Sequence, residues 1–444
     1  MTSRNGLWSG LNTCWVFAFL ALLIVVPWGY VAVPLVAGMT LLAGLALTPP
    51  QRLWRRLERD DVLLCAVLLA YGGLWLGDVW RTGHWPVGEG NQGILLPLWP
   101  WLAAALLVWL RRYPPPAQTL WWGAGGGALG AGAIALYERL MLGETRASNA
   151  MNAIPFGNLS LLLGMLSLMG ALWCLGRGLS GRRALLALCL LGATAGVTGS
   201  LLSGTRGGWI AAPLLLLLVY RASAPLVTPA LRRRLALGIL AGLLAVALLP
   251  QSGVSDRVDQ ASRDLQQYWQ DDSRATSVGL RLEMWRAGAT LFPERPLAGW
   301  GEGRLEAARD RLVAKGEFPP GISRYDQLHS DMIDTTVRRG LLGLGTLLLL
   351  YGVPLWLFWR RAKGSRRDPT LGVLATAGMM VPIAFVDFGL TQSMLRDVRG
   401  LSGYLGLCII VWVALRRSEE QEPGHVQKTD VRQASIHNIS IPGS

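Results

Sequence analysis

The sequence predicts an all-α polytopic membrane protein with about twelve transmembrane helices and one large helical loop outside the bilayer. Of its 444 residues, 52% are hydrophobic and 16% are charged, whereas about a quarter of the residues in a soluble domain are charged. The 54 glycines and 20 tryptophans are typical of helices that pack in lipid and carry aromatic side chains at the interfaces. These observations exclude an ordinary soluble enzyme.

A spanning helix needs about 20 mostly apolar residues. We expect the first span to be retained and not cleaved as a signal peptide, because Arg4 is the only charge before residue 52 and no small-residue cleavage site follows. The candidate spans are 12–28, 29–48, 61–79, 94–110, 117–137, 155–176, 184–202, 209–220, 235–250, 340–359, 369–388 and 400–415.

The basic residues lie in clusters that occupy alternate connections between the spans. Cytoplasmic connections carry an excess of Lys and Arg, so we expect both termini to be cytoplasmic. Clusters placed between apolar runs do not indicate nucleic-acid binding, although the net charge is +14. The clusters begin at Arg52, Arg111, Arg177, Arg221, Arg360 and Arg416.

One connection between the spans is much longer than the others. With it, the sequence predicts that the chain is divided into four regions. Residues 1–250 would hold nine spans, 251–339 the outer helical loop, 340–416 three spans and 417–444 a disordered cytoplasmic tail. The loop has nearly balanced charge and helical periodicity, which is typical of a small folded unit. Its clearest periodic positions are Leu282, Trp285, Ala289 and Phe292.

Histidine is the scarcest candidate for acid–base chemistry. Two of the four histidines, His425 and His437, fall in the predicted tail, and His84 falls in a short outer connection. His329 ends the outer loop, where it is either a histidine packed at a helix interface or a general base near the membrane surface. At helical spacing it would share one face with Met332, Ile333, Thr336 and Val337.

A glycine-rich outer turn, Ser203-Gly-Thr-Arg-Gly-Gly208, holds a single charge at Arg206. Small residues let the backbone approach a ligand, and a guanidinium can contact a phosphate through two hydrogen bonds. Gly207 and Gly208 would supply backbone amides to the same anion. The alternative is a tight turn whose arginine reaches toward water.

Two further positions carry weaker signals. Arg281 and Trp285 stand four residues apart, which makes them neighbours on a helix, although Arg281 could simply pair with Glu283. Asp387 lies near the outer end of a span, where an acid indicates either a functional site or an ion pair with Arg396 or Arg399.

The sequence predicts no metal site and no cofactor. The outer side has two separated histidines, and Asp271-Asp272 alone is insufficient for a divalent ion. The cysteines lack paired spacing, which argues against a disulfide framework and a thiolate site. They are Cys14, Cys65, Cys174, Cys189 and Cys408.

These outer motifs, in this order, resemble the O-antigen ligase/polymerase superfamily of bacterial polysaccharide assembly. The resemblance covers about residues 200–345 and rests on the 203–208 turn, on Arg281-Leu-Glu-Met-Trp285 with the Pro-rich stretch after it, and on Leu328-His329-Ser330. Family members often have Asn after the histidine and an acid before the following glycine. Here those residues are Ser330 and Arg339.

The resemblance implies a fold like that of glycosyltransferases with lipid-linked donors, and a metal-independent, inverting transfer at the periplasmic face of the bacterial inner membrane. The donor would be O-antigen on undecaprenyl diphosphate and the acceptor a sugar of the lipid A–core oligosaccharide. His329 would be the base, and Arg206 and Arg281 would bind the diphosphate. Asp387 and Trp285 are possible supporting residues.

Other functions remain open at this stage. An O-antigen polymerase would use the same residues with a growing glycan as acceptor, and a protein O-oligosaccharyltransferase usually carries a further C-terminal domain. From another class, a transporter or flippase would suit twelve spans, but it should show related halves joined near the middle of the chain. A structural scaffold would not explain an arginine in the glycine-rich turn.

Overall fold

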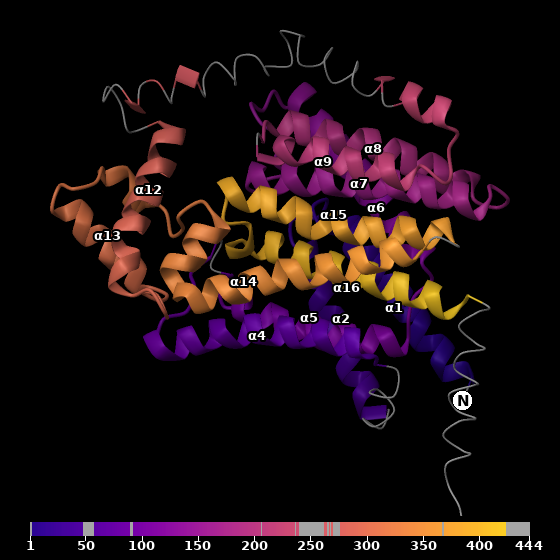
Figure 1. Cartoon of the computed structure of the whole chain (residues 1–444), viewed down its shortest axis with the longest axis horizontal. Coiled ribbons are helices and arrows are strands. Elements are labelled where there is room, and N and C mark those ends of the chain that lie inside the picture. Colours follow the sequence, from indigo (N-terminus) through magenta and orange to yellow (C-terminus); the bar gives the residue numbers. More distant parts are fainter. Residues whose placement is uncertain are drawn as a thin grey trace, which may run out of the picture.

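Long apolar helices form the body of the molecule (Figure 1). The computed structural model describes residues 2–47, 57–88, 92–205, 207–235, 237–238, 262–263, 266, 268–269, 276–365 and 368–422. Over these residues the regular structure is helical, and seven helices are long and apolar enough to cross a bilayer. The all-α polytopic class is therefore confirmed, while the full number of spans stays a prediction.

Each predicted span except 235–250 overlaps a helix, although the first helix begins and ends earlier than predicted, and 235–250 lies outside the described residues for most of its length. The helices of the first part are α1 (Thr2–Leu22), α2 (Gly29–Leu47), α4 (Arg59–Thr82), α5 (Leu95–Arg112), α6 (Gln118–Leu140), α7 (Ala153–Arg177), α8 (Arg183–Ser203) and α9 (Gly207–Ala222). They are followed by α12 (Ser277–Leu291), η3 (Phe292–Glu294), α13 (Arg304–Ala314), η4 (Pro320–Arg324), α14 (Asp331–Gly364), α15 (Pro369–Thr391), η5 (Met394–Arg396) and α16 (Val398–Glu420).

Local sequence sets where several helices begin and end. The side chain of Asn152 accepts a hydrogen bond from the backbone at the start of α7, and Asp368 and Asp397 do the same for α15 and α16. Thr276 caps α12 in this way. At its C-terminal end, α4 stops at Gly83, whose φ of 73° is readily adopted by glycine.

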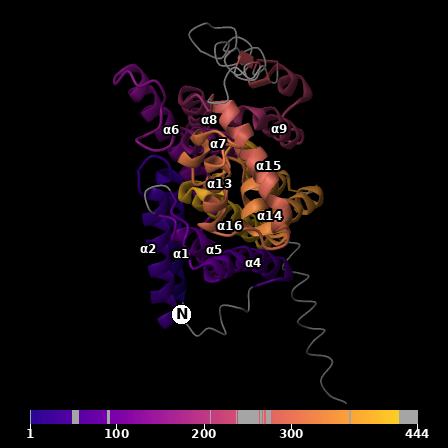
Figure 2. The same ribbon diagram turned by 90° about the vertical axis from the view of Figure 1, so that its left-hand side faces the viewer.

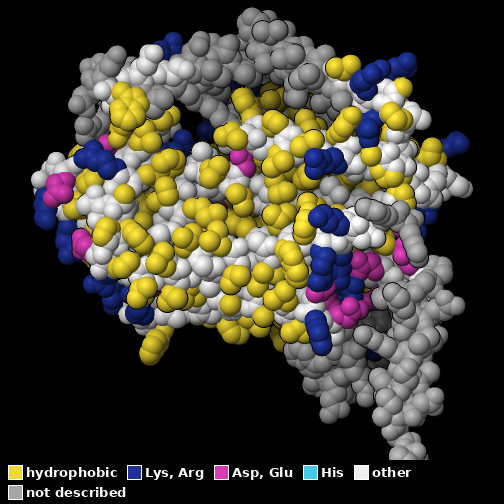
Figure 3. Space-filling model, viewed as in Figure 1, with side chains coloured by type: hydrophobic (Ala, Val, Ile, Leu, Met, Phe, Trp, Pro, Cys, Tyr) yellow, Lys and Arg dark blue, Asp and Glu magenta, His cyan; other side chains and the backbone are white. Residues whose placement is uncertain are grey.

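Helices α7, α15 and α16 lie at the centre of the bundle and are its most buried spans. Helix α2 lies at the edge, as the rotated view shows (Figure 2). Hydrophobic side chains cover the flank of the bundle (Figure 3), where a soluble protein would expose polar groups. This surface fits a hydrocarbon environment.

A smaller unit of α12, η3, α13 and η4 lies at one end of the bundle and has its own hydrophobic core (Figure 1). The α12 face turned to this core carries Met284, Ala287 and Leu291, one position away from the expected face, and Ala289 is exposed. The reason is that α12 packs against α13 and η4, which leaves Trp285 at the edge of the contact. The predicted loop limits, 251–339, stay a prediction because most of 251–275 lies outside the described residues.

Candidate functional site

The periodicity of the sequence predicts His329 on a helix, but in the structure it lies in the turn before α14. Helix α14 begins at Asp331, and the φ of His329 is 52°, a left-handed value that is uncommon for residues other than glycine. The residue before the turn is fixed at both of its backbone polar groups, because the Leu328 N–H donates to Asp334 Oδ1 at 3.0 Å and Trp285 Nε1 donates to the Leu328 carbonyl at 2.9 Å. The turn therefore holds the imidazole in a set direction.

The imidazole of His329 is oriented by a residue that sequence reasoning missed. Its Nδ1 lies 2.7 Å from Oε1 of Gln392, which is buried just after α15. With the amide oxygen as acceptor, Nδ1 carries the proton and Nε2 is left as the acceptor of a neutral ring. On its other side the ring meets the edge of Tyr325, with centroids 4.8 Å apart.

The surroundings of His329 favour its uncharged form. Burial lowers the pKa of His329 below its usual value, and although the Gln392 hydrogen bond opposes this shift, the positive charge of Arg281 adds to it. Trp285, one helical turn after Arg281 on α12, donates to the Leu328 carbonyl, so α12 runs alongside the turn that holds His329.

The glycine-rich turn reaches the same place from another direction. Arg206 itself lies outside the described residues. Gly207 begins α9, and a Cβ on it would lie 2.7 Å from Thr391 Oγ1. Since Thr391 directly precedes Gln392, the turn packs against the residue next to the partner of His329. A Cβ on Gly208 would come as close to Asn158, at 2.8 Å, so this approach requires small residues.

Asp387 supports α9. Its Oδ2 accepts a hydrogen bond from the backbone N–H of Ala211 at 3.0 Å. The two arginines considered as partners for it contact other acids: Arg396 pairs with Glu302 at 2.9 Å, and Arg399 pairs with Asp397 at 2.9 Å. Asp387 therefore helps to place the helix that carries Gly207.

Beneath the turn lies a buried cluster of charges that sequence reasoning also missed. Glu302 accepts hydrogen bonds from Arg338 at 3.1 Å, Arg396 at 2.9 Å and Trp75 Nε1 at 3.0 Å. Burial by itself would raise the pKa of Glu302, but Arg338 and Arg396 outweigh it and hold the pKa below its ordinary value. Arg338 also pairs with Asp334 at 3.2 Å, so the cluster ties residue 302 to the start of α14.

Arg339, which stands where the family often has an acid, belongs to the same cluster. Its guanidinium lies 4.1 Å from the ring centroid of Trp75 and 3.7 Å from Glu302. The next residue, Gly340, kinks α14 with a φ of 65°, and a Cβ there would lie 2.1 Å from the Leu297 carbonyl oxygen. The kink seats the segment around residue 297 against α14.

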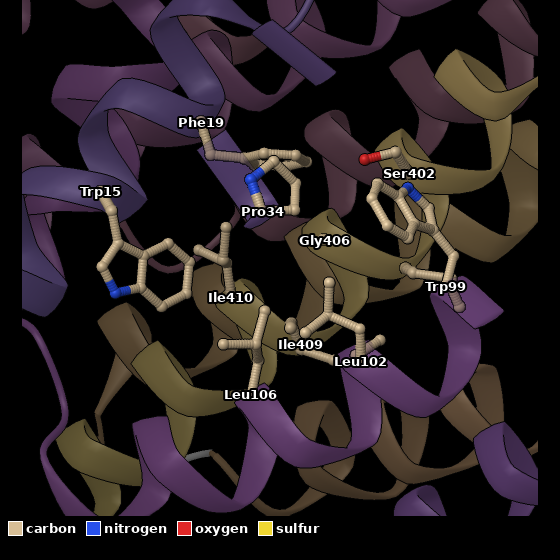
Figure 4. A pocket seen from close by; sticks show the side chains of 12 residues that line it. Trp15, Phe19, Pro34, Trp99, Leu102, Leu106, Ser402, Gly406, Ile409 and Ile410 are labelled. Atoms are coloured by element: carbon tan, nitrogen blue, oxygen red, sulfur yellow. The ribbon is translucent and has the colours of Figure 1, made fainter. Parts of the chain in front are cut away.

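Two further features bear on ligands. Among the described residues, no three His, Cys, Asp or Glu side chains are grouped to hold a metal ion. A cavity of about 370 Å³ lies between α1, α2, α5 and α16 (Figure 4). Apolar side chains such as Trp15, Phe19 and Ile410 line it. Such a lining suits a hydrocarbon chain and offers no group for catalysis.

Fold and site together define a class: a multi-pass helical membrane protein that fixes a neutral imidazole beside an arginine at one end of its bundle. Comparison with known proteins narrows this class. Residues 189–348, which include all three predicted motifs, match the family model described as O-antigen ligase. Over this region the chain is similar to the O-antigen ligase superfamily.

Individual relatives are distant. A Haemophilus influenzae protein described as uncharacterized is 24% identical over 310 residues, which are 69% of this chain and 76% of the relative. An Escherichia coli protein described as O-antigen ligase is 25% identical over 138 residues, or 31% of this chain. That match spans 33% of the E. coli protein.

Proposed function

We propose that this protein is an O-antigen ligase. It would transfer O-antigen polysaccharide from undecaprenyl diphosphate to a sugar hydroxyl of lipid A–core oligosaccharide, without a metal ion. The observation that carries the proposal is His329, a neutral imidazole fixed by Gln392 next to Arg281. In this arrangement the protein lies in the bacterial inner membrane with both termini in the cytoplasm and the site facing the periplasm.

The reaction follows from the roles that these groups can take. Nε2 of His329 takes the proton of the acceptor hydroxyl while the hydroxyl oxygen attacks the anomeric carbon of the donor. The bond from that carbon to the diphosphate oxygen breaks, and undecaprenyl diphosphate leaves with the electron pair. One displacement inverts the anomeric centre. The base therefore acts on the acceptor, and the leaving group is handled separately.

Cationic and backbone donors would stabilise the leaving diphosphate. Arg281 lies within electrostatic reach of His329, and Arg206 precedes the first residue of α9. Gly207 and Gly208 form the first turn of α9, where backbone N–H groups have no partner within the helix and can bind an anion. Positioning and charge stabilisation of this kind can supply much of the catalysis.

A transfer assay with the purified protein tests the proposal. The assay contains detergent, excess chelator, undecaprenyl-diphosphate-linked glycan and lipid A–core, and products are separated by gel and mass. We expect glycan on lipid A–core. Glycan that lengthens on undecaprenyl diphosphate would instead identify a polymerase with the same site. Transport of the lipid-linked glycan across proteoliposomes without any transfer would overturn the proposal in favour of a flippase.

A further inference from the structure

Three arginines surround one tryptophan in a hollow on the outer side of α13. The hollow is open to solvent, spans about 830 Å³ with that solvent included, and is lined by Arg295, Trp300, Arg304, Ala307 and Arg311. Its aromatic wall is rigid, because Trp300 Nε1 donates to the Leu291 carbonyl at 2.9 Å and the Trp300 N–H donates to the Val337 carbonyl at 3.1 Å. The hollow therefore has a fixed floor with mobile cationic side chains around it.

The arginines converge without neutralising acids. The guanidinium carbons of Arg295 and Arg311 lie 4.7 and 5.7 Å from the ring centroid of Trp300, and Arg304 donates to the Arg81 carbonyl at 3.1 Å. Within the described part of the chain, no carboxylate forms an ion pair with Arg295, Arg304 or Arg311. Like charges at this spacing repel, so an anion bound among them would be stabilised.

Two acids of α13, Glu306 and Asp310, are already engaged. Glu306 pairs with Arg338 at 2.8 Å, and Asp310 pairs with Arg309 at 3.1 Å. Both contacts turn the acids away from the three exposed arginines and toward buried guanidiniums. The positive charge of the hollow is thus built into the packing of α13.

The hollow lies at the border between the charged end of the molecule and its apolar flank. Pro296 and Leu297 accept backbone hydrogen bonds from Leu341 at 2.8 Å and Leu342 at 3.2 Å, next to the kink in α14. Leu297, Leu341 and Leu342 are 66%, 49% and 56% exposed. Figure 3 shows basic side chains at the α13 end beside this hydrophobic surface.

An exposed tryptophan marks the same border. Trp80 is 89% exposed and directly precedes Arg81, the residue whose carbonyl binds Arg304. Exposed tryptophan at the end of an apolar helix is typical of the level of lipid headgroups. The arginines are therefore placed where a headgroup, and not a fully soluble anion, is at high local concentration.

We propose that this hollow binds the phosphate-bearing headgroup of a membrane lipid. A guanidinium group can form two parallel hydrogen bonds to a phosphate. Three arginines can make such contacts around one headgroup. The lipid chains would lie along Leu297, Leu341 and Leu342. This site shares no residue with the proposed diphosphate site and does not depend on the proposed transferase activity.

The test uses the full-length protein in neutral detergent with dioctanoyl phosphatidic acid as probe and native mass spectrometry as readout. We expect the combined variant Arg295→Gln, Arg304→Gln, Arg311→Gln to bind about tenfold more weakly or worse, which corresponds to the loss of at least one charge-assisted contact. Dioctanoylglycerol, which has the chains but no phosphate, should bind poorly to the unchanged protein. Unaltered affinity in the combined variant would overturn the proposal.

A matched control removes the same charge elsewhere. Arg183, Arg233 and Arg234 are exposed, and their triple replacement by Gln should leave phosphatidic acid binding unchanged. An equal loss in this control would mean that net charge, and not the hollow, attracts the lipid. Binding of inorganic phosphate as tight as that of phosphatidic acid would overturn the assignment to a lipid. Because all six side chains are exposed, both variants should keep the melting temperature of the unchanged protein.

Discussion

Ion pairs close both ends of the helical bundle, and at one end they lie beneath His329, whose burial favours the uncharged imidazole. At the end away from His329, Asp60 contacts Arg361 at 2.9 Å, and Arg361 also contacts Glu419 at 3.0 Å. These pairs join the first turn of α4 to the last turns of α14 and α16. These pairs are partly exposed, but beside them the pair of Arg111 and Asp61, 3.0 Å apart, is fully buried.

At the other end the pairs are buried and surround a neutral site. Glu302 and Arg338 are each 1% exposed in their side chains, and they lie under the turn that carries His329. His329 itself bonds a neutral amide, that of Gln392, and not a carboxylate. Both ends therefore contain buried ion pairs, and the difference is that those near His329 lie under a group whose uncharged form is favoured by burial.

Removal of the His329 imidazole should have the largest effect of the changes considered, and it should appear in the transfer rate. We expect His329→Ala to lower the transfer rate by about 10²- to 10⁴-fold, because no other group would take the acceptor proton. The turnover of purified protein in the transfer assay measures this. His84→Ala is the matched control, since His84 bonds the Thr82 carbonyl on α4, and it should retain activity. Equal losses in the two variants would point to damage to the fold rather than to a base.

The second largest effect should come from the buried charge cluster around Glu302, and it should appear in the stability of the protein and not in the transfer rate. Glu302→Gln keeps the shape but leaves Arg338 and Arg396 short of a negative partner, which should cost about 3–5 kcal/mol of unfolding free energy. Asp60→Asn makes the same change in the partly exposed pairs and should cost about 1 kcal/mol or less. Thermal unfolding in detergent compares them. Similar losses at both ends would remove the distinction between them.

Sequence patterns were sufficient for the helices and for part of the site. Apolar runs predict where helices lie because lipid-facing and buried positions are both hydrophobic, and His329 stands out because histidine is scarce outside the predicted tail. The periodicity from His329 to Val337 was misleading, however. The Asp334 side chain binds the Leu328 N–H at 3.0 Å, and this contact favours a turn that ends before the helix begins.

Long-range partners could not be predicted in the same way. Gln392 is 63 positions from His329 and follows α15 with no motif around it. Glu302 and Arg338 stand in stretches rich in other charges, so nothing in the sequence distinguishes a buried ion pair from a solvated one. Only the packing of α4, α14 and η5 around residue 302 determines which charges meet.

Arg281→Lys should have a smaller effect that separates geometry from charge. A lysine keeps the positive charge but loses the planar fork, so we expect kcat/KM to fall about tenfold while the acid limb of the pH profile stays in place. Arg281→Gln removes the charge that lowers the pKa of His329, so that limb should move to higher pH. Steady-state rates measured from about pH 4.5 to 8.5, a range that brackets the reference imidazole pKa of about 6.5, distinguish the two variants.

A lysine variant with full activity would count against a bidentate contact to the diphosphate. A glutamine variant whose acid limb does not move would place Arg281 outside the working site. Either result would also weaken the contrast between the two ends of the bundle, because the neutral state of His329 would then owe nothing to its cationic neighbour.

The smallest effect should come from a single-atom change beside the base, Gln392→Glu. A carboxylate at 2.7 Å from Nδ1 stabilises the imidazolium, so the pKa of His329 should rise by about one unit and the acid limb should move up by the same amount. Above that limb the rate should approach that of the unchanged protein, because the tautomer is preserved. Gln421→Glu, the same change at the far end of α16, should leave the profile unmoved. An acid limb that stays in place in Gln392→Glu would mean that Gln392 does not touch the base during turnover, and that burial alone keeps His329 neutral.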